Sequence, residues 1–278
     1  MARHYKGQWF MRRVEWRCGD YVEVDFYPVF QKPGVRRKKS KPSSAIQQKL
    51  NERNSERKLI RTVHANFGEG DYALSLTFRE KPELEEAKKI FTKKFMPAVR
   101  RAYAEAGAVL KYLYIVERGQ KSGRIDIHLI ISGGIGRDTL ESLWKYGYAN
   151  ARRLQFTEKG VEALTQYMTK QGRKKDAERV TYRRWSGSKN LVHPQPEVSD
   201  AGTTMKDAEE LAELIDRRDA EEKAQQMFPG YALTEARALW NGCNRGLYIS
   251  LNLCSRARWK CRPYALYSVI DQREAETD

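Results

Sequence analysis

The segment from Tyr112 to Ser132 constrains the fold most, because it alternates apolar and polar residues on both sides of a glycine-bounded polar gap. It reads YLYIVERGQKSGRIDIHLIIS, a pattern typical of two antiparallel strands joined by a short connection. Alternate side chains of a strand point to opposite faces. The second strand is therefore expected to place Asp126 and His128 together on one face. Its other face would carry Ile125, Ile127, Leu129 and Ile131.

The register of this hairpin predicts a metal site. If the turn lies at the centre of the polar gap, Glu117 faces Asp126 directly. Two opposed carboxylates repel each other, and a divalent cation between them removes that cost. His128 would complete a set of three ligands. A solvent-exposed polar face is the simpler interpretation, but apolar Ile115 and Ile130 share this face and favour a covered one, where carboxylates need a partner.

The patterns around the hairpin predict an α+β fold with a mainly antiparallel sheet of about five strands and flanking helices. Strands are expected over 71–78 and 148–156, in addition to the two of the hairpin. Helices are expected over 82–108, with a break near Pro97, and over 136–147 and 160–171.

The two ends of the chain predict additions to this core. Before it lie a possible strand pair over 14–30 and a long helix over 43–67; after it lie an acidic helix over 204–228 and a strand pair formed by 246–254 and 262–270. We therefore expect three parts: a basic, aromatic N-terminal segment with the long helix (1–65), the core (66–192) and a C-terminal extension (193–278).

The composition favours a nucleic-acid partner. The net charge is +16, and the chain has 15 Tyr, 6 Trp and 9 Phe, which suits a polyanion with exposed bases. Basic ribosomal or membrane-surface proteins share the charge. The cations expected to contact the phosphates of such a partner are Arg36, Arg37, Lys38, Lys39, Lys41, Arg152, Arg153, Arg183 and Arg184.

The sequence gives no sign of a membrane protein or a secreted one. It has no apolar run long enough to span a bilayer and no secretory signal at its N-terminus. Its four cysteines lack the CxxC spacing of a zinc site. We expect reduced thiols and a cytoplasmic location.

A tyrosine and a lysine on one predicted helix complete the set of candidate catalytic residues. Tyr167 and Lys170 are spaced i to i+3, which places them on the same helical face. A tyrosine hydroxyl can attack phosphorus if a neighbouring cation stabilises its phenolate. Taken alone, this spacing is common in solvated amphipathic helices.

Taken together, these motifs resemble those of the rolling-circle replication initiators of the HUH endonuclease superfamily, in particular the bacterial plasmid and phage type. The family's strand motif matches LSLTF with Thr77, its histidine motif matches Asp126-Ile127-His128, its upstream acidic ligand matches Glu117, and its YxxK motif matches Tyr167 to Lys170. The resemblance covers roughly residues 5–195.

The resemblance implies an RRM-like or ferredoxin-like core that nicks and rejoins single-stranded origin DNA through a 5′-phosphotyrosine intermediate. It implies Tyr167 and Lys170 as catalytic residues, Glu117, Asp126 and His128 as metal ligands, and Thr77 as a DNA contact. Single-stranded DNA or an origin hairpin, a host helicase and a polymerase are the implied partners. The sequence does not indicate an oligomeric state.

The chain departs from the family at one position, because Asp126 stands where the first motif histidine is expected. An aspartate beside Glu117 makes a harder site that suits Mn²⁺ or Mg²⁺. The other interpretation is a degenerate site in a non-catalytic single-stranded nucleic-acid-binding protein, which would stack bases on Tyr112 and Tyr114. A related transposase or relaxase fits less well, because the further histidines lie in unsuitable contexts.

Overall fold

The computed structural model describes residues 9–30, 45–118, 123–154, 185–241, 246–257 and 265–271. The chain divides into two compact units. One consists of Ile46–His193, and the other of Met1–Ala45 with Pro194–Asp278. We refer to them as the central unit and the terminal unit.

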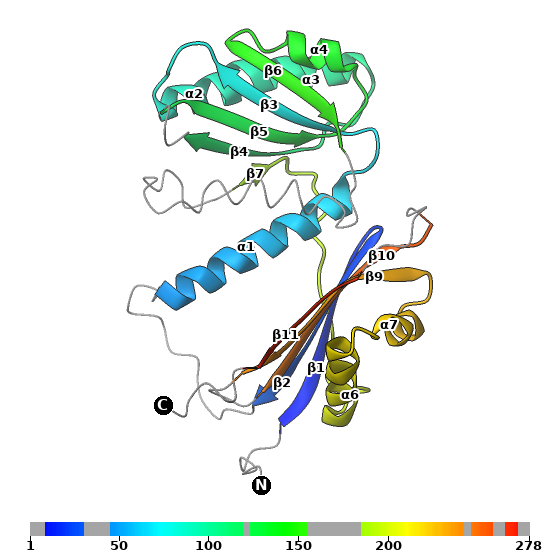
Figure 1. The fold of residues 1–278 in the computed structure, drawn as a ribbon. Helices are drawn as coiled ribbons and strands as arrows, with labels where there is room; N and C mark the ends of the chain where they lie inside the picture. Colours follow the sequence, from blue (N-terminus) through cyan, green and yellow to red (C-terminus); the bar gives the residue numbers. More distant parts are fainter. Residues whose placement is uncertain are drawn as a thin grey trace. The chain divides into compact units, whose positions relative to one another are not determined.

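The central unit is built on a five-stranded sheet with the order β6-β3-β5-β4-β7 (Figure 1). All of its strand pairs are antiparallel, which confirms the α+β class and the mainly antiparallel sheet. The strands are β3 (Tyr72–Phe78), β4 (Tyr112–Arg118), β5 (Ile125–Ile131), β6 (Gly147–Arg153) and β7 (Ser186–Gly187).

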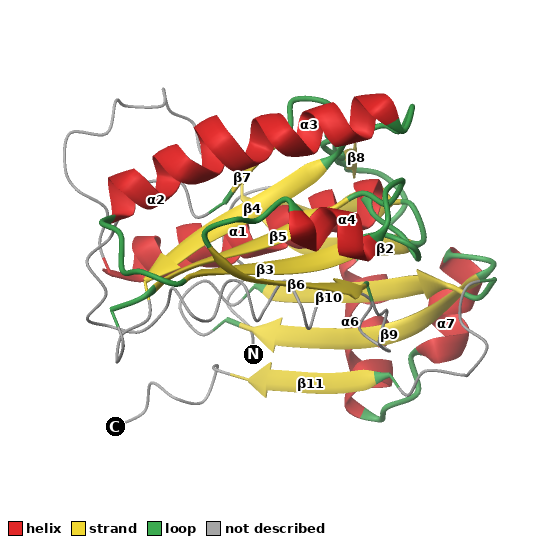
Figure 2. Cartoon of the chain, turned by 90° about the horizontal axis from the view of Figure 1, so that it is seen from above, coloured by secondary structure: helices red, strands yellow, loops and turns green. Residues whose placement is uncertain are grey.

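One face of this sheet is covered by helices α2, α3 and α4, as Figure 2 shows. Their bounds are α2 (Leu84–Ile90), α3 (Met96–Glu105) and α4 (Arg137–Ser142). A π-helical turn, Phe91–Phe95, links α2 to α3. Pro97 lies in the first turn of α3, directly after it, and the right-handed helical dihedrals of Phe91, Phe95 and Met96 continue the helix through the expected break. The core here combines the inward residues of β3 and β5 with Phe91, Phe95, Val99 and Tyr103.

Helix α1 (Ala45–Asn66) packs on the opposite face of the same sheet. Leu59 and Val63 of this helix are fully buried, in one cluster with Leu113, Ile115, Ile130, Leu154 and Leu191. The end of α1 is fixed to the chain at Val192, because the Asn66 amide donates to the Val192 carbonyl at 2.7 Å and accepts from its N–H at 2.8 Å. The long helix therefore belongs with the core and covers a sheet face.

The terminal unit has a six-stranded sheet with the order β11-β9-β10-β2-β1-β8. Helices α6 (Met205–Asp216) and α7 (Glu221–Met227) cover one face of it. Neither of them, nor any other helix within the described ranges, is long and apolar enough to cross a membrane. The strands are β1 (Trp9–Cys18), β2 (Tyr21–Phe30), β8 (Glu197–Ser199), β9 (Tyr231–Trp240), β10 (Leu247–Ser255) and β11 (Leu266–Asp271).

The structure divides the chain differently from the three parts expected over 1–65, 66–192 and 193–278. Both ends of the chain build one sheet, because β2 pairs antiparallel with β10. The expected pair of tail strands is also wrong. β10 lies between β9 and β2, and β11 pairs parallel with β9.

The acidic helix expected over 204–228 is interrupted after Asp216. Its start is fixed by a reciprocal cap between Thr204 and Asp207. Arg218 adopts a φ of 61°, a left-handed conformation that ends the helix before α7 begins.

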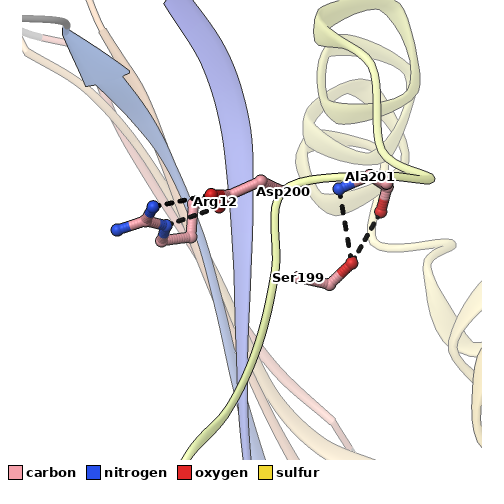
Figure 3. Close-up of polar contacts among 4 residues, drawn as sticks. All are labelled: Arg12, Ser199, Asp200 and Ala201. Carbon is pink, nitrogen blue, oxygen red and sulfur yellow. Dashed lines mark hydrogen bonds and ion pairs between the residues drawn. The ribbon is translucent and has the colours of Figure 1, made fainter.

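A surface ion pair joins β1 to the segment after β8. Arg12 Nε lies 2.5 Å from Asp200 Oδ1, and Arg12 Nη2 lies 2.7 Å from Asp200 Oδ2 (Figure 3). The hydrogen bonds from Arg12 hold the pKa of Asp200 below its usual value. Both side chains remain substantially exposed to solvent.

Candidate metal centre and nucleic-acid interface

A row of four side-chain positions crosses the central sheet on the face where α1 packs. On β5, Asp126 pairs with Glu117 of β4 on one side and with Thr77 of β3 on the other. Thr77 in turn pairs with Tyr148 of β6. Directly paired residues of neighbouring strands share a face. The pairing of Glu117 with Asp126 confirms the hairpin register expected from the sequence.

The next row on the same face contains His128, which is paired with Ser75 of β3. The two ring nitrogens of His128 have different neighbours. Nδ1 lies 3.3 Å from the Ser75 hydroxyl, and Nε2 lies 3.6 Å from Glu117 Oε2. The ring is therefore held with one nitrogen toward a hydroxyl and the other toward a carboxylate, the orientation that a histidine ligand requires.

Apolar packing partly covers this polar region. Ile115 and Ile130 are buried in the cluster beneath α1, as the sequence pattern indicated. The Glu117 and His128 side chains each retain 15% exposure. The ionisable groups are thus shielded enough for strong electrostatic interactions, yet they remain accessible from solvent.

Asp126 is the least compensated group of the three. Among the described residues, its Oδ1 atom is buried and has no hydrogen-bond partner. Desolvation raises the pKa of Asp126 above its usual value, and the neighbouring Glu117 raises it further, while His128 and Arg124 oppose the shift. A bound cation would remove both the desolvation cost and the repulsion.

The residues present fit a hard divalent ion, since two carboxylates and one imidazole suit Mn²⁺ or Mg²⁺. Within the described part of the chain, however, no group of three His, Cys, Asp or Glu side chains could hold a metal ion as it stands. Glu117, Asp126 and His128 would therefore have to turn toward an ion on binding.

Thr77 is held firmly at the centre of the first row. Its carbonyl accepts a hydrogen bond from Trp144 Nε1 at 2.9 Å, and its hydroxyl donates to the Tyr148 carbonyl at 3.3 Å. A Cβ added to Gly147 would lie 2.2 Å from the Thr77 carbonyl oxygen. Only glycine therefore permits β6 to approach β3 this closely, and the approach positions Tyr148.

The two arginines expected to bind DNA on β6 lie on opposite faces. Arg152 is exposed and pairs with Ala73, on the same face as Asp126. Arg153 faces the other way, because its Nη1 donates to the Gly70 carbonyl and its guanidinium lies 4.2 Å from the Tyr72 ring centroid. Arg152 is thus placed with the candidate site, and Arg153 has a structural role.

Ser75 and Tyr148 are two site residues that were not predicted from the sequence. Ser75 could have been found from alternation, because it lies two residues before Thr77 and shares its face. Tyr148 required the knowledge that β6 pairs with β3.

The other predicted residues lie outside the described residues, so their proposed roles stay predictions. They are the nucleophile and its lysine, Tyr167 and Lys170, and the cations Arg36, Arg37, Lys38, Lys39, Lys41, Arg183 and Arg184.

Comparison with known proteins provides one match. Residues 71–172 match the family model of the replication-associated protein ORF2, a range that runs from the start of β3 past both Tyr167 and Lys170. No curated protein and no solved structure matches significantly. The matched range contains the row of Glu117, Asp126 and Thr77. Residues 71–172 thus form a domain similar to replication-associated proteins, which supports a relationship to the rolling-circle replication initiators and a role in replication initiation.

Proposed function

We propose that this protein initiates rolling-circle replication by nicking and rejoining single-stranded origin DNA through a covalent phosphotyrosine. The observation that carries this proposal is the position of Asp126. It is a partly buried carboxylate that faces Glu117, lies beside His128 and has an unpartnered oxygen among the described residues. Such an arrangement costs stability unless a cation binds, and it lies within the replication-associated domain.

In this mechanism Glu117, Asp126 and His128 would hold a divalent cation, and Ser75 keeps the His128 ring in orientation. The cation would supply electrostatic stabilisation of charge that develops on the scissile phosphate. The Tyr167 hydroxyl attacks phosphorus, so that a Tyr–O–P bond forms and the bond from phosphorus to the 3′ oxygen breaks. Tyr167 gives up one proton, and the departing 3′ oxygen gains one to become a 3′ hydroxyl. Lys170 stabilises the phenolate.

The reverse reaction rejoins the strands. Because the phosphotyrosine retains a phosphodiester linkage, a 3′ hydroxyl can attack it and release Tyr167 with no external energy source. The sequence contains no GxxxxGK[ST] phosphate loop. We therefore infer that a host helicase separates the strands and a host polymerase extends the 3′ end.

The test is the formation of a covalent complex. Wild-type protein incubated with candidate origin single strands and Mn²⁺ should give an adduct that survives denaturing electrophoresis, and a chelator should prevent it. Tyr167→Phe should abolish the adduct and leave DNA binding within a few fold. Full adduct yield in Tyr167→Phe would move the nucleophile to another tyrosine, and no adduct with any strand or ion would overturn the proposal.

A non-catalytic binding protein remains the second candidate, and one observation favours it. Asp126 replaces the first histidine of the family motif, and the described side chains do not form a ready three-ligand group. The variant Asp126→His separates the two candidates. If the wild type is inert with every ion and Asp126→His gains nicking activity, the site is degenerate; if both are active, Asp126 is an adapted ligand.

A further inference from the structure

Strand β6 forms one edge of the central sheet and carries a second set of polar side chains on the face of the candidate site. Among the described strands it pairs only with β3. Its residues Tyr148, Asn150 and Arg152 pair with Thr77, Ser75 and Ala73, respectively. Alternate residues of a strand are about 7 Å apart, so these three side chains form a regularly spaced line on that face.

Tyr148 is the most unusual member of this line. Its side chain is 66% exposed, although it occupies the same row as the shielded Asp126 and Glu117. An exposed tyrosine on an edge strand is often only a solvated residue. Here its backbone is held close to β3, because the Thr77 hydroxyl donates to its carbonyl and the absence of a side chain at Gly147 permits the close approach of the two strands. A rigidly placed, exposed ring loses little entropy when a flat ligand stacks on it.

The chemistry of the line matches one class of ligand. An exposed aromatic ring stacks on an unpaired base, a side-chain amide bonds to a base edge or a sugar, and a guanidinium contacts a phosphate. In the order Tyr148, Asn150, Arg152, these groups lead along the sheet edge away from the row that contains Asp126. The net charge of +16 favours a polyanion.

We infer that β6 is a binding track for single-stranded DNA, in which Tyr148 stacks on a base beside the scissile phosphate, Asn150 contacts the neighbouring nucleotide and Arg152 binds a phosphate. This inference rests on the proposed nicking function, and it specifies where the substrate strand enters the site. A duplex does not fit the track, because paired bases are stacked on each other and expose no face to Tyr148.

Binding of fluorescein-labelled oligo(dT), measured by anisotropy, tests the track. Tyr148→Ala should weaken binding about tenfold, the usual effect of losing one base–aromatic stack. Tyr148→Phe keeps the ring and should bind within about twofold of the wild type. Arg152→Ala should weaken binding and reduce its salt dependence by the equivalent of about one phosphate contact. Unlabelled duplex should compete poorly.

Arg101→Ala is the matched control for Arg152→Ala. Arg101 is an exposed residue of α3, the helix that covers the opposite face of the sheet, so its loss removes the same charge away from the track. It should leave both affinity and salt dependence unchanged. Equal effects of the two substitutions would reduce the role of Arg152 to general charge and overturn the track.

The covalent-adduct assay separates failure of the track from failure of the proposed function. If the wild type forms the adduct but Tyr148→Ala binds oligo(dT) as tightly as the wild type, the track is wrong and nicking stands. If no adduct forms in the wild type while Tyr148→Ala still weakens binding, the track stands and the nicking proposal fails. Loss of the adduct in Tyr148→Phe would make the Tyr148 hydroxyl a reactant and contradict a stacking role.

Discussion

Two shielded strand carboxylates, one in each unit, are stabilised in different ways. Glu15 of β1 is only 4% exposed and lies between two arginines of its own strand. Arg17 Nη2 is 2.6 Å from Glu15 Oε1, and Arg13 pairs with the other oxygen. Asp126 of β5 instead faces the carboxylate of Glu117.

This difference separates a structural charge from a functional one. The cations beside Glu15 come from positions i−2 and i+2, so the fold itself supplies them. Asp126 has Arg124 and His128 at the equivalent positions, but its pKa is nevertheless raised. Among the described residues, Glu15 Oε1 and Asp126 Oδ1 both lack a hydrogen bond, but Glu15 Oε1 has Arg17 Nη2 at 2.6 Å, whereas Asp126 Oδ1 has no such ion pair. A charge that the protein leaves uncompensated is the more suitable one for an external cation.

The largest expected effect is on activity. Glu117→Ala and His128→Ala should each lower nicking by at least about a hundredfold and weaken Mn²⁺ binding with it, because each removes a metal ligand. Glu15→Gln, assayed below its unfolding temperature, should nick within a few fold of the wild type. Gel assays of strand cleavage measure all three. A large loss of nicking activity in Glu15→Gln would contradict the distinction between a structural and a functional carboxylate.

A smaller effect is expected at the residue that orients the histidine. Ser75→Ala should weaken Mn²⁺ binding about tenfold, as loss of a partner that orients a metal-bound histidine usually does. Ser75→Thr keeps the hydroxyl and should restore most of the affinity. Calorimetric titration with Mn²⁺ measures the affinity of each variant. A general structural defect in Ser75→Ala would also lower its thermal midpoint, whereas loss of histidine orientation alone would not.

Neutralising each of the two carboxylates should change the free energy of unfolding of the metal-free protein in opposite directions. Glu15→Gln should lower the free energy of unfolding by about 1–2 kcal/mol, less than for a fully buried ion pair because both arginines are partly exposed. Asp126→Asn should raise stability at neutral pH. Because the folded state raises the pKa of Asp126, the wild type loses stability as pH rises from the unfolded value through the folded one.

Denaturant titrations of the metal-free proteins at several pH values measure both changes. The difference between the wild type and Asp126→Asn should be small below the unfolded pKa of an aspartate and grow toward neutral pH. If Asp126→Asn is destabilising at neutral pH, then Asp126 is as well compensated as Glu15.

The smallest effect is expected at the surface pair of the terminal unit. Asp200→Asn should cost little stability, because the charges of Arg12 and Asp200 are largely solvated. That cost should shrink further at high salt. Thermal unfolding at low and high ionic strength checks this. A large, salt-independent cost would mean that this pair compensates a charge as effectively as the arginines beside Glu15 do.

The sequence was sufficient to predict what depends on local pattern. The hairpin register that pairs Glu117 with Asp126 followed from alternation and a short connection, and so did the apolar cover at Ile115. The pairing of β2 with β10 did not, because it joins residues more than two hundred positions apart and no local pattern encodes it. The positions of Ser75 and Tyr148 beside the site depend in the same way on strand order. Arg152 and Arg153 show a further limit of prediction from sequence. Alternation places them on opposite faces of the sheet, but it does not indicate which face carries the site.

Calorimetric titration of the wild type with Mn²⁺, beside Asp126→Asn and Asp126→His, tests the central claim most directly. We expect one binding site in the wild type, with Mn²⁺ or Mg²⁺ preferred over Zn²⁺. Asp126→Asn should lose most of the affinity, because it keeps the shape and removes the charge, while Asp126→His should still bind and accept Zn²⁺ more readily. Unchanged Mn²⁺ affinity in Asp126→Asn, or no binding by the wild type, would contradict a metal site at Glu117, Asp126 and His128.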